Sequence, residues 1–440
     1  MQSTREIALR TLCQIEYEGA YPNLALDAAL TESGLDERDR SFVSELVYGT
    51  LRYLITEDYV IRHYSSIRLK KIAPKILMLL RLAVYQLLLM KSPSHAVCFE
   101  TVELAKRIGH SGSVRFVNAI VRRIAKDGMP SLPKEQVEAL SVQYSFPRWL
   151  VEKFIADFGE DAVGPLLASF QKVPPLSVRF NRLKTTSQEL KQLLQEQGIG
   201  VTDGLYSDLA LCLTRTGGVS HLEAYKDGLF TVQDEAAMLV ATVLDPRQGE
   251  RIWDVCAAPG GKTTQIAELC NNDAEILATD VHAHKIDLIQ SACKRLGITC
   301  VNAMQNDATA DCKKLGTFDR VLVDAPCSGL GILKRKTDIR HIRTMEDLKA
   351  LTEIQSAILN NVCSAVKDGG VLVYSTCTIN PDENEGVVNS FLKSHPEFVL
   401  EDVNQTLPAS VRSKEKCLTL LPHIYDCDGF FIARMKKVNV

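Results

Sequence analysis

Residues 255–264, Val-Cys-Ala-Ala-Pro-Gly-Gly-Lys-Thr-Thr, decide the fold of the C-terminal half of the chain. The apolar run before them, residues 251–255, predicts a buried strand, and residues 263–269 predict a helix. A strand, a glycine turn and a helix together present free backbone N–H groups and a helix N-terminus to a ligand. Gly260 and Gly261 therefore predict close approach of a ligand, which a Cβ atom would obstruct.

Two kinds of nucleotide site use such a turn. A phosphate-binding P-loop needs G-x-x-x-x-G-K-[ST], and residues 261–263 match its end, but Cys256 stands where its first glycine belongs. A pocket for a dinucleotide or for S-adenosylmethionine needs an acidic residue at the end of the next strand, to bind the ribose hydroxyls. Asp280 supplies it at the end of residues 274–280. The second kind of site is favoured, and a turn that only packs a helix on a sheet is the simplest alternative.

The composition indicates a globular protein of several domains. The chain has 440 residues, which suggests two or three domains, and 46% hydrophobic and 24% charged residues are ordinary for a soluble protein. Its most apolar run, residues 76–90, is too short to cross a bilayer, and the N-terminus lacks a signal-peptide core, so we expect a cytoplasmic protein with no membrane association. Thirteen cysteines without a C-x-x-C pair predict reduced thiols, no disulfide framework and no bound metal.

The order of predicted elements gives an α/β protein with three domains. Residues 1–130 predict an all-helical domain, and Gly and Pro at residues 128–133 mark its end. Residues 131–230 predict a small α+β subdomain. In residues 231–440 strands alternate with helices, which predicts a doubly wound, mostly parallel sheet. The strands expected there are residues 251–256, 274–280, 300–305, 318–324 and 370–376.

Polar residues and thiols follow these strands at their carboxyl ends, where such sheets bind ligands. The first three strands lead to Cys256, Asp280 and Asp307. The fourth leads to Asp324-Ala-Pro-Cys327 and the fifth to Ser-Thr-Cys377. A lone cysteine more often belongs to a core. Two cysteines at adjacent strand ends predict that at least one is catalytic, because thiolates are strong nucleophiles.

Methylation at C5 of a pyrimidine needs such a thiol. C5 of cytosine attacks a sulfonium methyl group only after a thiolate has added at C6, and the thiol is eliminated once a base removes the C5 proton. Asp324 is placed to stabilise the adduct near N3 and the exocyclic amine. A free thiol has a pKa of ~8.5, so the site should lower it, through Lys262 or the positive sulfonium.

Three motifs resemble those of the RNA cytosine-C5 methyltransferases: residues 256–263, Cys-Ala-Ala-Pro-Gly-Gly-Lys-Thr; residues 324–329, Asp-Ala-Pro-Cys-Ser-Gly; and residues 374–385, Tyr-Ser-Thr-Cys-Thr-Ile-Asn-Pro-Asp-Glu-Asn-Glu. Arg-Phe-Val-Asn-Ala-Ile at residues 115–120 resembles a NusB-like RNA-binding domain. The combination is similar to the RsmB (Fmu/Sun) branch, which modifies 16S ribosomal RNA, over nearly the whole chain. It implies a Rossmann-like class I methyltransferase domain after a NusB-like domain and the α+β subdomain.

The resemblance also implies roles, with S-adenosylmethionine as cofactor. Asp280 would hold the ribose hydroxyls, Asp307 would lie near the adenine, and Asp324 would lie between cofactor and target base. Cys377 would be the nucleophile and Cys327 would assist product release. The residues alone leave this choice open, because DNA cytosine methyltransferases use the Pro-Cys thiol. The other implied cofactor contacts are Cys256, Ala257, Ala258, Pro259, Gly260, Gly261 and Lys262.

Basic residues predict where RNA binds. The net charge is −3, but residues 61–130 contain 13 Lys and Arg against three Asp and Glu, which predicts a basic face for a polyanion. Lys-Arg-Lys at residues 334–336 and Arg-His-Ile-Arg at residues 340–343 follow the Cys327 loop and predict phosphate contacts, with a solvated face as the alternative. The weaker candidates are Arg179, Arg182 and Lys184.

Extruding a base costs a few kcal/mol, and less in unfolded RNA, so the expected substrate is naked or partly assembled 16S rRNA. The protein is expected to act as a monomer. Two other functions stay open: an RNA-binding assembly factor without activity, and a P-loop ATPase. The family's Gly-Thr before residues 428–431 is replaced here by Asp426-Cys427, the one visible departure from the pattern.

Overall fold

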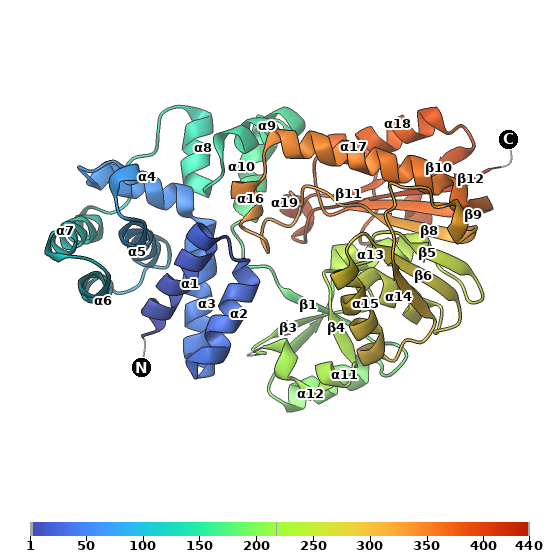
Figure 1. The fold of residues 1–440 in the computed structure, drawn as a ribbon, viewed down its shortest axis with the longest axis horizontal. Helices are drawn as coiled ribbons and strands as arrows, with labels where there is room; N and C mark the ends of the chain where they lie inside the picture. Colours follow the sequence, from blue (N-terminus) through green and yellow to red (C-terminus); the bar gives the residue numbers. More distant parts are fainter. Residues whose placement is uncertain (1–2, 217, 439–440) are drawn as a thin grey trace. The chain divides into compact units, whose positions relative to one another are not determined.

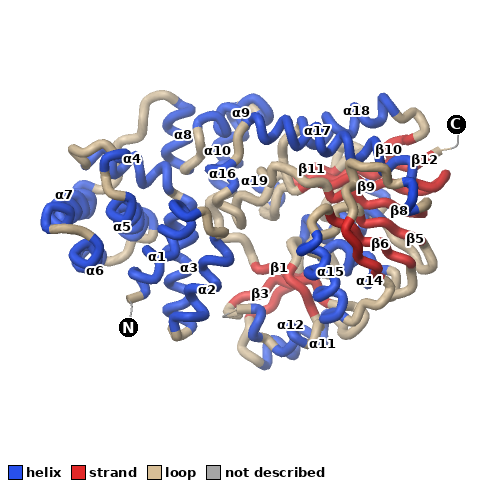
Figure 2. The backbone as a smooth tube through the Cα atoms, viewed as in Figure 1, coloured by secondary structure: helices blue, strands red, loops and turns tan. Residues whose placement is uncertain are grey.

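The computed structural model describes residues 3–216 and 218–438 of the chain. The chain forms two compact units, Met1–Gln171 with Lys336–Ile342, and Lys172–Arg335 with Arg343–Val440. The first unit is helical, and the second contains two sheets with helices around them (Figures 1 and 2). Within the described ranges, no helix is both long and apolar enough to cross a membrane.

The first unit is helical, as expected for residues 1–130, but it extends past the predicted end at residue 130, because α8, α9 and α10 belong to the same unit. Ser3 and Asp36 accept backbone N–H groups as N-caps of the first and third helices, and Pro74 begins α5, where its missing N–H costs nothing. The apolar faces of the first seven helices meet in one core that includes Leu12 and Leu46. The elements are α1 Thr4–Glu18, α2 Pro22–Ser33, α3 Glu37–Arg52, α4 Leu54–Tyr64, η1 Leu69–Lys71, α5 Pro74–Val84, the π-helix η2 Tyr85–Leu89, α6 Ser94–Ile108, α7 Ser111–Asp127, α8 Gln136–Tyr144, α9 Arg148–Phe158 and α10 Glu160–Ser169.

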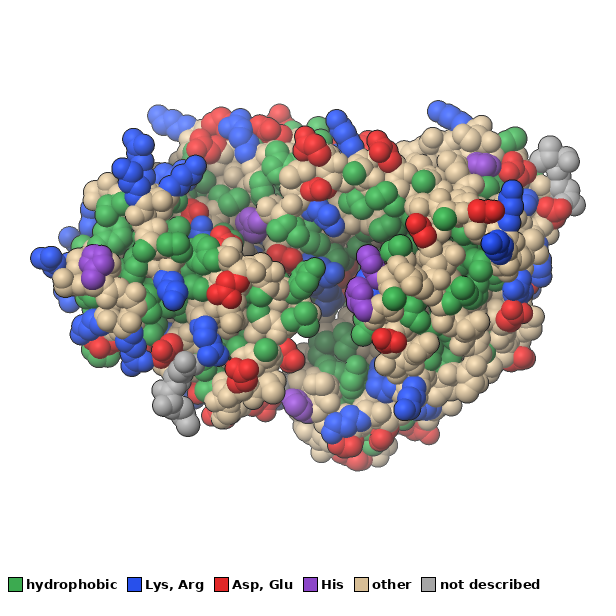
Figure 3. Space-filling view, viewed as in Figure 1, with side chains coloured by type: hydrophobic (Ala, Val, Ile, Leu, Met, Phe, Trp, Pro, Cys, Tyr) green, Lys and Arg blue, Asp and Glu red, His purple; other side chains and the backbone are tan. Residues whose placement is uncertain are grey.

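The basic residues of this unit are mostly exposed. Of the 13 Lys and Arg in residues 61–130, Arg81 is buried and paired with Asp58 and Glu16, and the other twelve are exposed. Lys and Arg side chains gather over the end of the unit that carries α6 and α7 (Figure 3). The exposed ones are Arg62, Arg68, Lys70, Lys71, Lys75, Lys91, Lys106, Arg107, Arg115, Arg122, Arg123 and Lys126.

A segment from far along the sequence completes the first unit. Lys336–Ile342, with the short helix α16 Ile339–Ile342, belongs to this unit and not to the one that precedes and follows it in the chain. Its Arg340 side chain is fully buried. The guanidinium lies 4.2 Å from the centroid of the Phe146 ring and donates to the carbonyls of Arg52 and Ser145 at 3.4 and 3.5 Å. Burial and the nearby charge of Arg52 lower the pKa of Arg340 to about 9.

The second unit begins with a small α+β subdomain that starts at residue 172 and not at the predicted residue 131, because residues 131–171 pack in the first unit. Its sheet has the antiparallel order β2-β3-β1-β4 and packs α11 through Leu190 and Leu194. Thr186 and Glu189 form a capping box that fixes the start of α11. The elements are β1 Leu176–Phe180, α11 Ser187–Glu196, β2 Gly200–Asp203, β3 Ala210–Thr214, η3 Val219–His221, α12 Glu223–Lys226 and β4 Phe230–Val232.

The larger sheet confirms the doubly wound architecture. Its order is β10-β12-β9-β8-β5-β6-β7, parallel from β7 to β9, with β12 antiparallel to β9 and β11 paired to β12. The strands are β5 Arg251–Asp254, β6 Glu275–Asp280, β7 Val301–Gln305, β8 Phe318–Asp324, β9 Val366–Thr376, β10 Phe398–Glu401, β11 Leu418–Leu420 and β12 Phe430–Lys437. The five strands predicted from sequence are all present.

Helices cover both faces of this sheet (Figure 1). Apolar residues of α13, α14 and α15 pack on one face and those of α17 and α18 on the other. Strand order reverses at β5, which lies between β6 and β8, so the carboxyl ends of these strands surround a crevice. The helices are α13 Glu235–Leu244, α14 Gly261–Leu269, α15 Ala283–Leu296, η4 Lys313–Leu315, α17 Met345–Val362, η5 Cys363–Ala365, the π-helix η6 Asp382–Gly386, α18 Val387–Ser394, η7 Val403–Gln405 and α19 Pro422–Tyr425.

Candidate functional site

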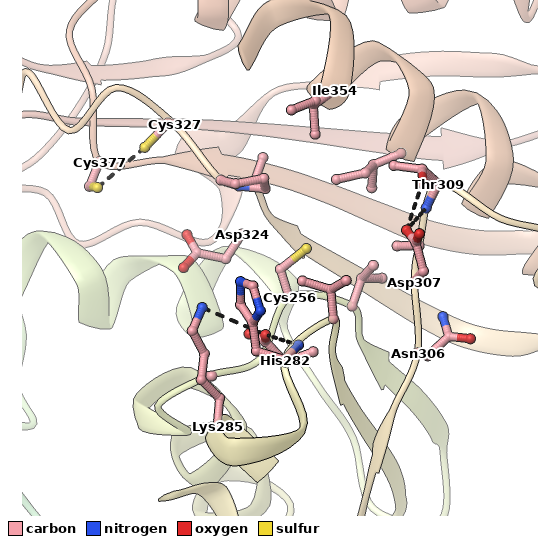
Figure 4. Close-up of a pocket in the computed structure, with 18 residues that line it drawn as sticks. Cys256, His282, Lys285, Asn306, Asp307, Thr309, Asp324, Cys327, Ile354 and Cys377 are labelled. Atoms are coloured by element: carbon pink, nitrogen blue, oxygen red, sulfur yellow. Dashed lines mark hydrogen bonds and ion pairs between the residues drawn. The ribbon is translucent and has the colours of Figure 1, made fainter. Parts of the chain in front are cut away.

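A cavity of about 560 Å³ lies at the carboxyl ends of the parallel strands (Figure 4). Every one of these strands contributes to its wall, as the topology requires. The predicted site residues that line it are Cys256 and Ala258 after β5, Asp280 at the end of β6, Asp307 after β7, Asp324 and Cys327 after β8, and Cys377 after β9. The strand-end prediction therefore brings these residues together.

A second cavity of about 190 Å³ adjoins the first and shares Cys256, Ala258 and Asp324 with it. The other predicted residues that line it are Ala257, Pro259, Gly261 and Lys262. Gly260 lines neither cavity, at φ 101°, and a Cβ there would lie 3.2 Å from the Ile289 backbone of α15. Gly260 is thus required by the turn and by helix packing, whereas a Cβ on Gly261 would meet open space.

The two predicted thiols face each other. Asp324 and Ser375 are paired in register on β8 and β9, so the loops that follow leave the sheet side by side. The Sγ atoms of Cys327 and Cys377 are 3.3 Å apart, and Figure 4 shows them pointing toward one another. The hydrogen bond to Cys377, and then burial, raise the pKa of Cys327 well above its ordinary value. Cys327 is therefore held in its thiol form.

An ion pair lies between the two cavities. Lys262 Nζ donates to Asp324 Oδ2 at 2.7 Å, and Ser375 Oγ donates to the other oxygen at 2.9 Å. Burial alone would lower the pKa of Lys262, but the charge of Asp324 and the hydrogen bond to it outweigh burial and raise it. The ammonium group is therefore charged, and a carboxylate and a cation are both available where the cavities meet.

The two acids at the ends of β6 and β7 differ in their surroundings. Asp280 accepts the backbone N–H of His282 at 3.0 Å and lies 3.6 Å from Lys285 Nζ. Asp307 is exposed and accepts both the backbone N–H and the hydroxyl of Thr309, at 2.9 and 2.7 Å. These bonds lower the pKa of Asp307. Both acids lie in the wall of the larger cavity, where their carboxylates can accept hydrogen bonds from a ligand.

Asp254, which the sequence reasoning missed, is the buried acid of the smaller cavity. It ends β5, and its Oδ2 accepts the Thr263 hydroxyl at 2.6 Å, while Oδ1 has no hydrogen-bond partner among the described residues. Burial raises its pKa to about 7. Burying an aspartate in an apolar strand costs free energy, so such a residue often has a functional role. The acidic residue within the apolar run 251–255 was the sequence pattern that could have identified Asp254.

Arg179 was predicted as a weak phosphate contact, and the structure contradicts this. Its side chain is fully buried and pairs with both carboxylate oxygens of Glu268 at 3.1 and 2.8 Å. It also donates to the carbonyl of Gly261 at 2.8 Å and to Gln233. Arg179 thus ties the small sheet to the glycine turn. Lys184 donates to two backbone carbonyls, and Arg182 is exposed.

The basic residues 334–343 were predicted to contact phosphates, and burial makes this wrong for two of them. Lys334 is 2% exposed and Arg340 is fully buried in the first unit. Arg335 pairs with Asp234 and Asp428, each at 2.7 Å. The other contacts run from Lys334 Nζ to the Cys427 carbonyl at 3.3 Å and from Arg343 Nε to the Ser328 carbonyl at 3.3 Å. The unusual Asp426-Cys427 loop is thus a partner of these cations, and Lys336 and Ile342 are exposed.

Metal-ligand groups are absent from the described ranges: no three or more His, Cys, Asp or Glu side chains gather where they could hold a metal ion. A doubly wound sheet with a glycine turn, strand-end acids and a cavity along its carboxyl edge is the arrangement of a Rossmann-like methyltransferase.

Family comparisons define the protein more closely. A family model described as 16S rRNA methyltransferase RsmB/F matches residues 241–436, one described as NusB family matches residues 2–126, and one described as Methyltr_RsmF/B-like, ferredoxin-like domain matches residues 146–220. Probable ribosomal RNA small subunit methyltransferase B of Bacillus subtilis is 38% identical over 99% of both chains. Ribosomal RNA small subunit methyltransferase B of Yersinia pseudotuberculosis is 32% identical over 98% of both. The chain belongs to the 16S rRNA methyltransferase RsmB/F family, and the predicted family is confirmed.

Solved structures share the fold. The crystal structure of PH0851 has a TM-score of 0.85 and 26% identity, over 99% of both chains. A methyltransferase homolog protein from Pyrococcus horikoshii has a TM-score of 0.60 and 27% identity, over 70% of this chain and 100% of that one. NSun6 from Pyrococcus horikoshii, solved with SFG, has a TM-score of 0.59 and 24% identity over 68% of this chain and 100% of that one.

Proposed function

We propose that this protein transfers a methyl group from S-adenosylmethionine to C5 of a cytosine in 16S ribosomal RNA, through a covalent bond between Cys377 and C6. One observation carries the proposal: two thiols lie 3.3 Å apart in the same cavity as the acids that end β6 and β8. Family membership supports rRNA as the substrate. Neither a P-loop ATPase nor an inactive assembly factor needs two thiols in contact there.

The residues around the cavities fit S-adenosylmethionine, which supplies an electrophilic methyl group when it is bound. Asp280 offers a carboxylate to the ribose hydroxyls, and apolar side chains of α17 line the region near Asp307, where a purine ring can lie. Residues 256–259 with Gly261 and Lys262 would contact the methionine and ribose parts. Asp254 Oδ1, which lacks a partner within the described residues, can accept from the ammonium group. The S-adenosylmethionine analogue SFG in NSun6 supports this cofactor for the same fold.

Cys377 acts as the nucleophile. Its thiolate adds to C6 of the target cytosine, and the electron pair of the C5–C6 bond makes C5 nucleophilic. The Lys262 ammonium favours the thiolate form, since cations lower thiol pKa values. Asp324, held by Lys262 and Ser375, stabilises the adduct at N3 and the exocyclic amine.

Cys327 assists release of the product. Loss of the C5 proton to a base and cleavage of the C6–S bond restore the aromatic ring and leave Cys377 as a thiolate. The Cys327 thiol, whose pKa is raised, donates its S–H to that sulfur and so stabilises the departing thiolate. The two cysteines thus need different protonation states, and their contact supports this division of roles.

The exposed cations of the first unit are proposed to bind the RNA backbone. In this division the first unit binds RNA, residues 172–230 form a second RNA-binding subdomain, and the large sheet with its helices catalyses transfer. The substrate is 16S rRNA that is naked or partly assembled, where the cytosine can be extruded at lower cost, and the enzyme acts as a monomer in the cytoplasm.

Methyl transfer to a 16S rRNA transcript tests the proposal. Incubation with tritiated S-adenosylmethionine should label the transcript, and bisulfite sequencing should find a cytosine that resists conversion. The same cytosine should become convertible in rRNA from cells that lack the protein. Labelled RNA in which every cytosine still converts would refute the C5 position, and unlabelled RNA with intact binding would favour an inactive assembly factor.

A further inference from the structure

The loops that carry the two thiols converge on one buried carboxylate. Glu383 belongs to the π-helix η6, which follows the Cys377 loop, and its side chain is 0% exposed. On one side its oxygens accept the backbone N–H of Ser328 at 2.8 Å and the Ser328 hydroxyl at 2.5 Å. Ser328 directly follows Cys327. The Glu383 carboxylate thus binds the loop of Cys327 at the next residue, Ser328.

The same carboxylate binds the second loop. Asn380 Nδ2 donates to Glu383 Oε1 at 3.0 Å, and the Thr378 hydroxyl, directly after Cys377, lies 3.5 Å from that oxygen. Ser328 and Thr378 also bond to each other, at 2.8 Å between their hydroxyl oxygens. The residues that follow each cysteine are therefore joined both directly and through Glu383.

A third element, α17, also donates hydrogen bonds to the Glu383 carboxylate and to the Cys327 loop. Gln355 of α17 donates from one Nε2 to Glu383 Oε2 and to the Pro326 carbonyl, each at 2.9 Å. Pro326 directly precedes Cys327. All donors to the carboxylate are neutral groups, so the buried charge is satisfied by hydrogen bonds and not by an ion pair.

Glu383 itself is fixed to β9 through its backbone and its neighbour. The Tyr374 hydroxyl donates to the Glu383 carbonyl at 2.6 Å. Asn384 accepts the Thr376 hydroxyl at 2.6 Å and donates to the Thr378 carbonyl at 3.0 Å. These bonds hold η6 against β9, and the bonds from Ser328 to the Glu383 carboxylate link the loop after β8 to the same position.

We propose that Glu383 is a positioning residue that holds the loops of Cys327 and Cys377 in one arrangement and so keeps the two sulfurs in contact. The importance of that contact for product release rests on the proposed function, but the geometric role does not. Glutamine at this site has the same shape and one acceptor oxygen fewer, so its N–H₂ group would face the donors of Ser328 and Asn380 at one position or those of Ser328 and Gln355 at the other. We expect Glu383→Gln to separate the loops.

Oxidative cross-linking measures the contact without RNA or cofactor. The azo compound diamide takes two electrons and two protons from a pair of thiols, which leaves a disulfide, and the sulfurs must approach from 3.3 Å to about 2.0 Å. Peptide mass spectrometry then gives the rate of Cys327–Cys377 cross-linking in the full chain. We expect the rate to fall at least tenfold in Glu383→Gln and by less in Glu383→Asp, which keeps the charge with a shorter reach.

Glu385→Gln is the matched control, because Glu385 lies in the same short helix and its carboxylate accepts instead from Thr419, at 3.0 Å. It should cross-link like the unmodified protein. Unchanged cross-linking in folded Glu383→Gln would overturn the proposal. If that variant fails to fold, Ser328→Ala decides, since it removes the 2.5 Å bond, and a normal rate there would also overturn it.

Methyl transfer separates the two proposals. If Glu383 acts by position, Glu383→Gln should lower kcat at an unchanged KM for S-adenosylmethionine and accumulate the protein–RNA adduct. Slow cross-linking in a protein whose unmodified form methylates no cytosine would support the positioning role and refute the proposed function. If the unmodified enzyme methylates a cytosine, and Glu383→Gln cross-links and methylates as fast as it does, the proposed function would be supported and the positioning role refuted.

Discussion

The carboxyl edge of the large sheet and the basic stretch at residues 334–343 lie close in sequence. The positions of the edge residues could be predicted from the sequence, whereas the surroundings of the basic residues could not. At the edge, Cys327 and Cys377 lie where their strands predict, 3.3 Å apart. Seven residues after Cys327, Lys334 is almost completely buried, and further on Arg340 is fully buried. A strand end is fixed by topology, whereas a cation's surroundings depend on partners elsewhere in the chain.

The comparison separates two kinds of residue. Those at the edge should change chemistry when substituted and leave stability nearly intact. The two buried cations of the basic stretch, Lys334 and Arg340, should change stability and leave RNA affinity intact. The exposed cations of the first unit should do neither and should change affinity alone.

Cys377→Ala should have the largest effect. Without the nucleophile, methyl transfer should fall roughly a thousandfold or more, because loss of a covalent nucleophile removes a whole pathway. S-adenosylmethionine should still bind in calorimetry, and the free energy of unfolding should change by less than about 1 kcal/mol. Retained transfer would reassign the nucleophile.

Cys327→Ala should leave the first step and slow the last. The adduct of Cys377 with RNA should accumulate and migrate as a slower band on a denaturing gel, and turnover should fall by roughly a hundredfold. The double variant with Cys377→Ala, which cannot form the bond, is the control. A gel without the slower band would contradict the release role.

Arg340→Ala should destabilise the first unit by about 3 kcal/mol, since it leaves a cavity beside Phe146 and two carbonyls without a donor. Denaturant unfolding measures the loss. Lys336→Ala, at an exposed position of the same segment, should change stability by less than about 0.5 kcal/mol. Unchanged stability with weaker rRNA binding would restore the phosphate role of Arg340.

Asp254→Asn tests the buried acid through pH. The folded-state pKa of about 7 exceeds the ordinary value of 3.8, so the folded protein binds more protons and loses stability as pH rises between those values. Between pH 5 and 8 the unmodified protein should lose roughly 2.5 kcal/mol more than the variant, which cannot ionise there. Parallel pH profiles of unfolding would mean that Asp254 titrates normally.

Reversal of two exposed cations should have the smallest effect. Lys70→Glu with Lys71→Glu, in η1, should weaken 16S rRNA binding roughly tenfold and reduce the slope of log affinity against log salt by about two. Lys336→Glu, a single reversal in the segment 336–342, serves as the comparison and should change affinity less. Equal losses would remove the distinction between the two basic regions.

The sequence predicted what periodicity and turn chemistry control. The parallel strands, their polar ends and the approach of Cys327 to Cys377 follow from the alternation of strands and helices and from the turn at residues 255–264. Partners distant in the chain were beyond it: Glu268 lies 89 residues from Arg179, and Arg52 lies 288 residues from Arg340. The role of Glu383 was hidden for the same reason, because Ser328 is 55 residues away.

The packing of Lys336–Ile342 in the first unit limits how the gene could be divided or recombined. The backbone passes from one unit to the other three times, after Gln171, after Arg335 and after Ile342. A single break in the gene therefore cannot yield two self-contained halves, because the C-terminal product would carry a heptapeptide that fits only the helices it has lost. Recombination that exchanged the helices alone would place Arg340 against residues that do not match it. These helices and this heptapeptide are therefore expected to evolve together.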